Sequence, residues 1–289
     1  MNQLVHQILS GLATGGIYAS VALALVMIYQ ATHLVNFAQG EMAMFATYLA
    51  WSLMQAGVPY WGAFAITVVS AFVLGVAIER IVIRPVENSP ILAVVIVFIA
   101  LLFIFNSVAG WIFTYTIKPF PSPFPAEPFF GNSYLSSHEL GSMAITLVVL
   151  LLLFVFFRFT PLGLAMRAAA QNPVSSRLVG IRVGWMLALG WGLAAAIGAI
   201  AGMMVAPTVF LEPNMMGGIL LYAFAGALLG GIDSPGGAVL GGFIVGVLEN
   251  VVGAYVGTEL KLTLALVVIV GVLVVRPSGL FGKIHVVRV

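Results

Sequence analysis

Long stretches without a charged side chain set the strongest limit on how this chain can fold. None of its 11 basic or 9 acidic residues lies in the stretches 1–40, 42–78, 88–117, 140–157, 183–211, 234–248 and 262–275. A helix of about 20 apolar residues crosses the ~30 Å hydrocarbon core of a bilayer. Only 7% of the residues are charged, against about 25% in soluble domains. The sequence therefore excludes a soluble enzyme, a nucleic-acid-binding protein and a disordered chain.

The apolar segments predict an all-α, polytopic membrane protein, with residues 1–289 forming one transmembrane domain. Segment 91–105 is continuously apolar, whereas the strands of a transmembrane barrel alternate apolar and polar residues. The predicted spanning helices lie near 8–29, 40–57, 61–80, 89–110, 140–157, 185–209, 217–232, 237–257 and 261–276. The second and seventh are short or interrupted by glycine. A count of eight or nine spans, or a re-entrant segment, therefore stays open.

The basic residues predict the orientation in the membrane. Most of them lie in two loops, 80–84 and 158–182, and in the tail from Arg276 onward. Cytoplasmic loops are enriched in Arg and Lys, which places the N-terminus outside and the C-terminus inside. Prolines prevent a regular helix in the outer loop 111–139, and its aromatic residues fit either an interfacial belt or a lid over a pathway.

The basic loop 159–184 has the pattern of a helical hairpin. Thr160 before Pro161 is typical of a helix start, Asn172 before a proline starts a second helix, and Gly180 ends it. Alanines and a glycine predict a smooth face that suits a rigid partner, although an ordinary positive-inside loop fits as well. The candidate docking residues are Gly163, Arg167, Ala168, Ala169, Asn172, Pro173, Arg177 and Gly180.

Polar residues interrupt the apolar segments at three further places. Asn36 and Gln39 have the spacing of a capping box, and a helix N-terminus there can hold an anion. Asp233 or Ser234 caps the helix that follows a glycine-rich tract, whose glycines four residues apart favour close helix packing. Glu249 lies inside a span, where an acid faces either the protein interior or an aqueous path. The tentative pathway residues are Asn36, Gln39, Glu41, Asp233, Glu249 and Asn250.

No motif for catalysis or nucleotide binding is present. Gly282 and Lys283 lack the rest of a P-loop, and no zinc motif or nucleophile elbow occurs. The chain has no cysteine, and its formal net charge of +2 comes from loop arginines, which implies no nucleic-acid partner. We therefore expect no metal site, no cofactor bound by this chain and no enzymatic activity.

Four motifs in order resemble the permease subunits of branched-chain amino acid ABC transporters of the LivH type. They are GLATGGIYASVALALVMIY leading into NFAQGEMAMFATYLA, then GLAMRAAAQNPVSSRLVGI, GGIDSPGGAVLGGFIVGVLEN and RPSGLFGK. The resemblance covers nearly the whole chain. One position departs from it, because Gln39 stands where the family often has His, which argues against a proton carrier there.

The resemblance implies a multi-pass subunit of the inner, cytoplasmic membrane. Its partners would be a homologous second permease, two cytoplasmic ATPases that bind ATP and Mg, and a periplasmic or extracellular binding protein. The loop 159–184 would couple to the ATPases, and the binding protein would dock near 111–139 and 210–216.

Other functions stay open at the level of the sequence. Related permeases carry urea, short amides or other small amino acids, because the binding protein sets much of the selectivity. A proton-coupled secondary transporter would use Glu41 or Glu249. An intramembrane enzyme is disfavoured, because no paired nucleophile and base is visible.

Overall fold

The computed structural model describes residues 2–32, 34–125, 127 and 135–282. Residues 128–134 of the outer loop, and Lys283 and Arg288 of the basic tail, lie outside the described residues. The long helices are α1 (Asn2–Thr32), α2 (Gln39–Gln55), α3 (Tyr60–Ile78), α4 (Ile91–Phe113), α5 (Ser137–Phe159), α8 (Val183–Val209), α9 (Met216–Gly230), α10 (Pro235–Tyr255) and α11 (Lys261–Val275). Shorter helices are η1 (Glu79–Ile83) and η2 (Arg84–Val86), which continue α3, then α6 (Pro161–Gln171), α7 (Pro173–Leu178) and η4 (Thr258–Leu260).

The predicted helical membrane protein is confirmed, and each predicted span coincides with one long helix. Within the described residues, seven helices are long and apolar enough to cross a membrane, and α9 is a shorter apolar helix. The 17-residue α2 is the other short segment, as its sequence indicates. The described residues contain no strand, and an isolated bridge pairs Lys118 with Leu211. The orientation in the membrane stays a prediction.

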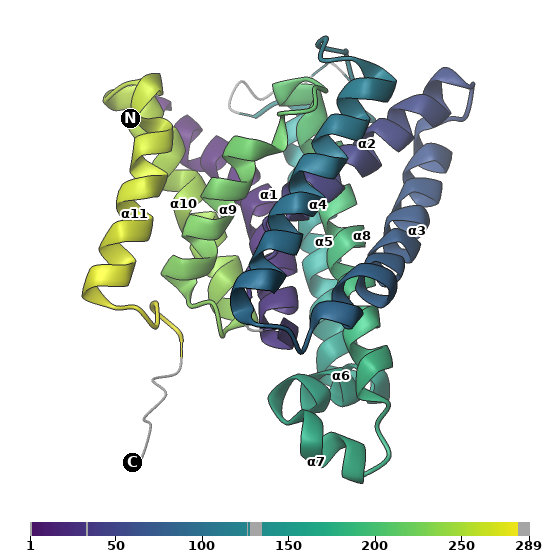
Figure 1. The fold of residues 1–289 in the computed structure, drawn as a ribbon. Coiled ribbons are helices and arrows are strands. Elements are labelled where there is room, and N and C mark those ends of the chain that lie inside the picture. The colour runs from purple at the N-terminus through teal and green to yellow at the C-terminus, as the bar shows by residue number, and fades with distance from the viewer. Residues whose placement is uncertain (1, 33, 126, 128–134, 283–289) are drawn as a thin grey trace. The chain divides into compact units, whose positions relative to one another are not determined.

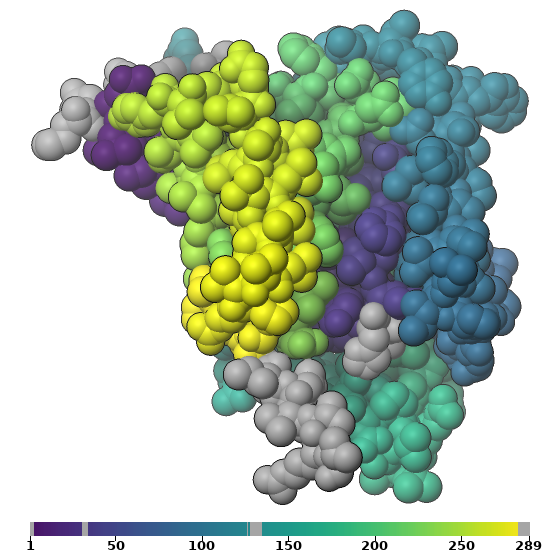
Figure 2. Space-filling model, turned by 60° about the vertical axis from the view of Figure 1, so that its left-hand side comes forward, coloured from purple at the N-terminus to yellow at the C-terminus, as the bar shows by residue number. Residues whose placement is uncertain are grey.

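The chain forms two compact units. Unit 1 comprises 1–26, 124–145 and 218–289, and unit 2 comprises 27–123 and 146–217. In unit 1, α11 exposes nearly its whole length, which Figure 2 shows in yellow. In unit 2, 83% of the most apolar 18-residue stretch of α8 is buried, whereas only 17% of the corresponding stretch of α4 is buried. The exposed apolar surfaces of α4 and α11 are the ones expected to face lipid.

Glycines bring the helices of each unit into close contact. In unit 1, a Cβ atom on Gly246 would lie 2.3 Å from the Cα atom of Gly15 in α1. In unit 2, a Cβ atom on Gly75 would lie 2.5 Å from the carbonyl oxygen of Trp191, where α3 packs against α8. Lipid tails are as apolar as the helix side chains, so the hydrophobic effect does not drive these helices together. Close packing through small residues holds them instead. The packing role predicted for the glycines of α10 is confirmed.

Candidate coupling hairpin and membrane-embedded polar clusters

The helices α6 and α7 form the hairpin that the sequence predicts. The Thr160 hydroxyl oxygen accepts a hydrogen bond from the Gly163 amide at 3.0 Å, and the Asn172 side-chain oxygen accepts one from the Ser175 amide at 2.9 Å. Gly180 follows α7 with a φ of +84°, a conformation that glycine adopts without strain. Figure 1 shows both short helices beyond the ends of α5 and α8. The capping residues therefore fix the shape of the hairpin.

Two small residues of α6 pack against the chain itself. Gly163 and Ala169 are buried, and a Cβ atom on Gly163 would lie 2.3 Å from the carbonyl oxygen of Phe156 in α5. Arg167 and Ala168 are half-buried. Gly163 and Ala169 therefore lie away from the exposed surface, and the docking role of Arg167 and Ala168 stays a prediction.

The exposed face of the hairpin lies on α7 and beyond it. Asn172, Pro173, Arg177 and Gly180 are exposed. Val174, Leu178 and Val179, which the sequence reasoning missed, are 68%, 84% and 76% exposed. In the sequence, Leu178 and Val179 follow Val174 by four and five residues, in a short segment bounded by Pro173 and Gly180. This apolar spacing is the signal that could have identified them. The tip of the hairpin is therefore apolar and flanked by Arg177.

The start of α8 is fastened to the end of α3. The Arg84 guanidinium lies 3.1 Å from the Glu79 carboxylate and donates to the carbonyl oxygen of Gly184. The Arg80 guanidinium lies 3.6 Å from the centre of the Trp185 ring, within the range of a cation–π interaction. Since α6 also packs against α8, the hairpin, α8 and the end of α3 are joined by direct contacts.

The connection between α1 and α2 is an irregular backbone segment next to the middle of α8. The Gln39 side-chain amide donates to the Ala194 carbonyl oxygen at 2.9 Å, and α8 runs from Val183 to Val209. The predicted capping box is wrong, because α2 has Ala38 as its N-cap and no side chain caps it. Asn36 instead accepts a hydrogen bond from the Ala38 amide at 3.0 Å. Asn36 and Gln39 are fully buried.

A polar cluster forms around Glu41, in the first turn of α2. Glu41 is 7% exposed, and Asn106 of α4 donates to its carboxylate at 3.4 Å. The same Asn106 amide donates to the Pro213 carbonyl oxygen at 3.0 Å, and Tyr115 donates to the Asn106 side-chain oxygen at 3.2 Å. The sequence reasoning found Glu41 but missed Asn106, a lone amide in the apolar segment 91–113. Irregular backbone and a buried acid among apolar helices are typical of a transport pathway.

In unit 1, Glu249 is the centre of a second cluster. The Lys261 ammonium nitrogen lies 2.8 Å from one carboxylate oxygen, and Tyr18 donates to the other at 3.0 Å. Tyr18 also stacks on Tyr222, with ring centres 5.0 Å apart. Asn250 donates to the Gly246 carbonyl oxygen of its own helix. Both carboxylate oxygens of Glu249 are therefore engaged in holding α1, α10 and α11 together.

The remaining candidates in unit 1 lie at the start of α10. Ser234, one of the two predicted caps, accepts a hydrogen bond from the Gly237 amide at 3.1 Å. Asp233 is half-buried beside it. Among the described residues no group of three or more His, Asp and Glu side chains has the arrangement of a metal site.

Comparisons with known proteins agree with this architecture. Residues 7–275 match the model of the family described as branched-chain amino acid transport system / permease component. The chain is 30% identical to the high-affinity branched-chain amino acid transport system permease protein LivH of Escherichia coli strain K12, over 99% of this chain and 97% of that protein. It is 29% identical to BraD of Pseudomonas aeruginosa, over 99% and 98%.

One solved structure has a similar fold. A chain of PsaBC from Streptococcus pneumoniae, solved in complex with Fab, has a TM-score of 0.51 and 14% sequence identity, covering 93% of this chain and 91% of that one. At this identity the likeness concerns the fold.

Proposed function

The chain belongs to the family of branched-chain amino acid transport permease components, and we propose that it carries branched-chain or related hydrophobic amino acids across the inner membrane as part of an ATP-driven importer. Its place as a membrane-spanning permease subunit follows from the family match over 7–275. The substrate class is supported by the names of the relatives LivH and BraD. The catalytic step, ATP hydrolysis, belongs to separate subunits.

The proposed assembly contains a homologous second permease, two cytoplasmic ATPases and an external binding protein. ATP and Mg bind to the ATPases, and no cofactor binds to this chain. The N-terminus lies outside and the C-terminus inside, as the positive-inside rule predicts. The binding protein docks near the loops 111–139 and 210–216, and the antiparallel bridge between Lys118 and Leu211, which joins the two segments within unit 2, supports this docking region.

The observation that carries this proposal is the exposed apolar tip of the α6–α7 hairpin. Val174, Leu178 and Val179 are more than two-thirds exposed at the end of a capped, rigid element, which is unusual for a surface that stays in water. Arg177 beside them favours a partner with an acidic rim. We assign this tip to the ATPase interface, where closure of the two ATPases displaces the hairpin.

The proposed mechanism passes this displacement through packed helices of unit 2. The hairpin moves α8, and α8 contacts α2 through Gln39 and through Gly202, where a Cβ atom would lie 2.4 Å from the Thr47 hydroxyl oxygen. Such a tight contact transmits a rigid-body shift. The irregular segment with Asn36, Gln39 and the Glu41–Asn106 cluster then alternates access to the pathway, while Glu249, Asn250 and Asp233 organise the helices of unit 1.

The test is a Leu178→Asp substitution in the complete reconstituted importer. Burying a leucine contributes about 1.5–3 kcal/mol, so we expect ATPase binding to weaken at least about tenfold and uptake of labelled leucine to fall accordingly. Gln171→Glu, which adds the same charge to an exposed position on the hairpin, is the control and keeps uptake. Normal coupling in Leu178→Asp would remove the tip from the interface. Uptake of urea in place of leucine would correct the substrate class.

A further inference from the structure

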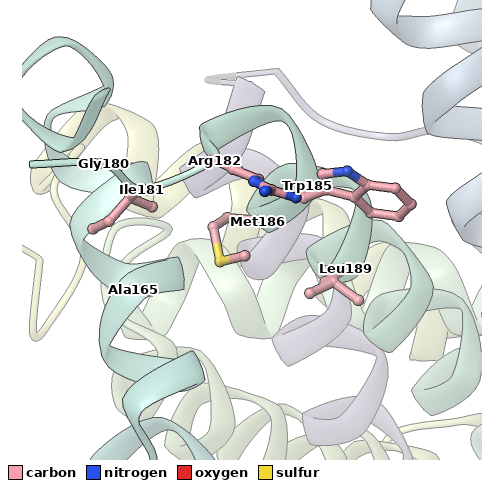
Figure 3. A pocket seen from close by; sticks show the side chains of 7 residues that line it. All are labelled: Ala165, Gly180, Ile181, Arg182, Trp185, Met186 and Leu189. Carbon is pink, nitrogen blue, oxygen red and sulfur yellow. The ribbon is translucent and has the colours of Figure 1, made fainter. Parts of the chain in front are cut away.

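An open pocket of about 470 Å³ lies between α6 and the start of α8. Its walls are mainly apolar and include Ala165, Ile181, Met186 and Leu189. Figure 3 shows the Arg182 side chain extending toward Trp185 at one end, whereas Met186 and Leu189 present sulfur and carbon atoms. This volume lies in the range of small-molecule sites, roughly 300–1,000 Å³. The lining therefore suits a ligand with one charged and one apolar part.

The charged end of the pocket is cationic. Arg182 is exposed and precedes the first turn of α8. Arg80 covers the ring of Trp185, and two of its buried nitrogens, Nε and Nη2, have no hydrogen-bond partner among the described residues. The nearest acid, Glu79, lies 3.8 Å from Arg80 and is engaged more closely by Arg84. Arg182 thus offers an exposed guanidinium to an anion in the pocket, and Arg80 adds a second positive charge next to the Trp185 wall.

We propose that this pocket binds the phosphate headgroup of an anionic phospholipid from the cytoplasmic leaflet. Arg182 donates to the phosphate oxygens, which a guanidinium group matches in geometry, and the positive charge of Arg80 beside Trp185 attracts the same phosphate. Trp185 is 47% exposed in the first turn of α8, and the end of a spanning helix is where tryptophan meets the membrane interface. The apolar wall packs against the glycerol and upper acyl chains. Basic pockets between helices on the cytoplasmic side suit this class of lipid.

The bound lipid would stiffen the joint between the hairpin and α8. The pocket residues Ile181 and Arg182 belong to the connection between α7 and α8. A bound lipid therefore restrains the segment through which the hairpin moves α8. The cytoplasmic location rests on the proposed orientation. Lipid binding itself requires neither ATPase nor transport, so it is measured separately from the proposed function.

The test uses quenching of Trp185 fluorescence by brominated lipids in nanodiscs that contain the full chain. The contribution of Trp185 is the difference between the wild type and Trp185→Phe. Phosphatidylglycerol and phosphatidylcholine with brominated chains are compared at the same small mole fraction in the same mixture. We expect brominated phosphatidylglycerol to quench more strongly, and Arg182→Gln and Arg80→Gln each to lower that preference about fivefold, as expected for one cationic contact near a membrane.

The control is Arg158→Gln, which removes an exposed arginine at the end of α5 outside the pocket and keeps the preference. Equal quenching by the two lipids overturns the proposal. The pocket would then accommodate a side chain of a docked partner instead. A preference that survives both arginine substitutions places the lipid elsewhere and also overturns it. Displacement by added inorganic phosphate shows a soluble anion site instead.

Discussion

The ion pair between Glu249 and Lys261 offers a direct test of why an acid lies inside α10. The two charges are 2.8 Å apart and attract by about 6 kcal/mol at an effective dielectric constant of about 20. The cost of removing them from water cancels much of this. The Lys261 side chain is 32% exposed, so we expect Glu249→Gln or Lys261→Met alone to cost about 2 kcal/mol, below the ~3–5 kcal/mol of fully buried pairs.

The double variant separates the pair from its single residues. Each single substitution strands one polar group, whereas Glu249→Gln with Lys261→Met leaves two neutral groups. At ~2–4 °C per kcal/mol, each single variant lowers the apparent melting temperature in nanodiscs by about 4–8 °C, and the double variant recovers most of the loss. Additive losses in the double variant would refute the reasoning, because they would mean that the two charges do not interact.

Transport by the same variants distinguishes packing from a pathway role. We expect Glu249→Gln to insert at the wild-type level but to reduce uptake, since α11 loses its attachment to α10. The double variant then regains uptake together with stability. If it regains stability and still fails to transport, the carboxylate acts on substrate, and the assignment of Glu249 to helix packing is wrong.

Gly253 provides a second, steric way to break the same pair. A Cβ atom there would lie 2.2 Å from the Cε atom of Lys261, so the lysine side chain reaches Glu249 only across a glycine. Gly253→Ala is expected to lower the melting temperature, although alanine favours a helix. Gly271→Ala in α11, where no atom lies within 4 Å of the added carbon, is the control. Equal changes in melting temperature in the two variants would show that Lys261 reaches Glu249 without crossing Gly253.

Two further predictions concern unit 2 and the orientation. Gly202→Ala wedges α2 away from α8 and should cost about 1–3 kcal/mol and reduce uptake, whereas Gly190→Ala, with a flexible methionine tip 3.8 Å away as its nearest neighbour, should be neutral in both assays. Because the chain has no cysteine, a membrane-impermeant maleimide applied to spheroplasts should label Thr258→Cys and spare Ser175→Cys, and the reverse pattern would invert the topology.

The helices were predictable because each span is a continuous run of mainly apolar residues in the sequence. Thr160 and Ser234, each followed by a proline, predict helix starts, and in the structure each caps the amide three residues ahead. Short α2 and α9 were recognised as unusual for the same reason. The division into two units was not predictable, since α1 and α5 each contribute to both and no change in composition marks the boundary.

The candidate sites were predictable only where a polar residue interrupts an apolar run. Glu41 and Glu249 stand out in this way, but their partners Asn106, Tyr18 and Lys261 come from distant segments. Burial within the hairpin was not predictable for a related reason. In the sequence Gly163 looks like part of a smooth surface, and only its packing on α5 shows that this glycine is buried.

Gln39 shows how a distant residue overrides a local rule. Its spacing from Asn36 favours a capping box, yet its amide donates to the Ala194 carbonyl oxygen. The space for that contact comes from Gly198, because a Cβ atom there would lie 2.6 Å from the amide nitrogen of Gln39. Gln39 therefore links the first turn of α2 to the middle of α8. That contact is why we place the moving part of the pathway at α2.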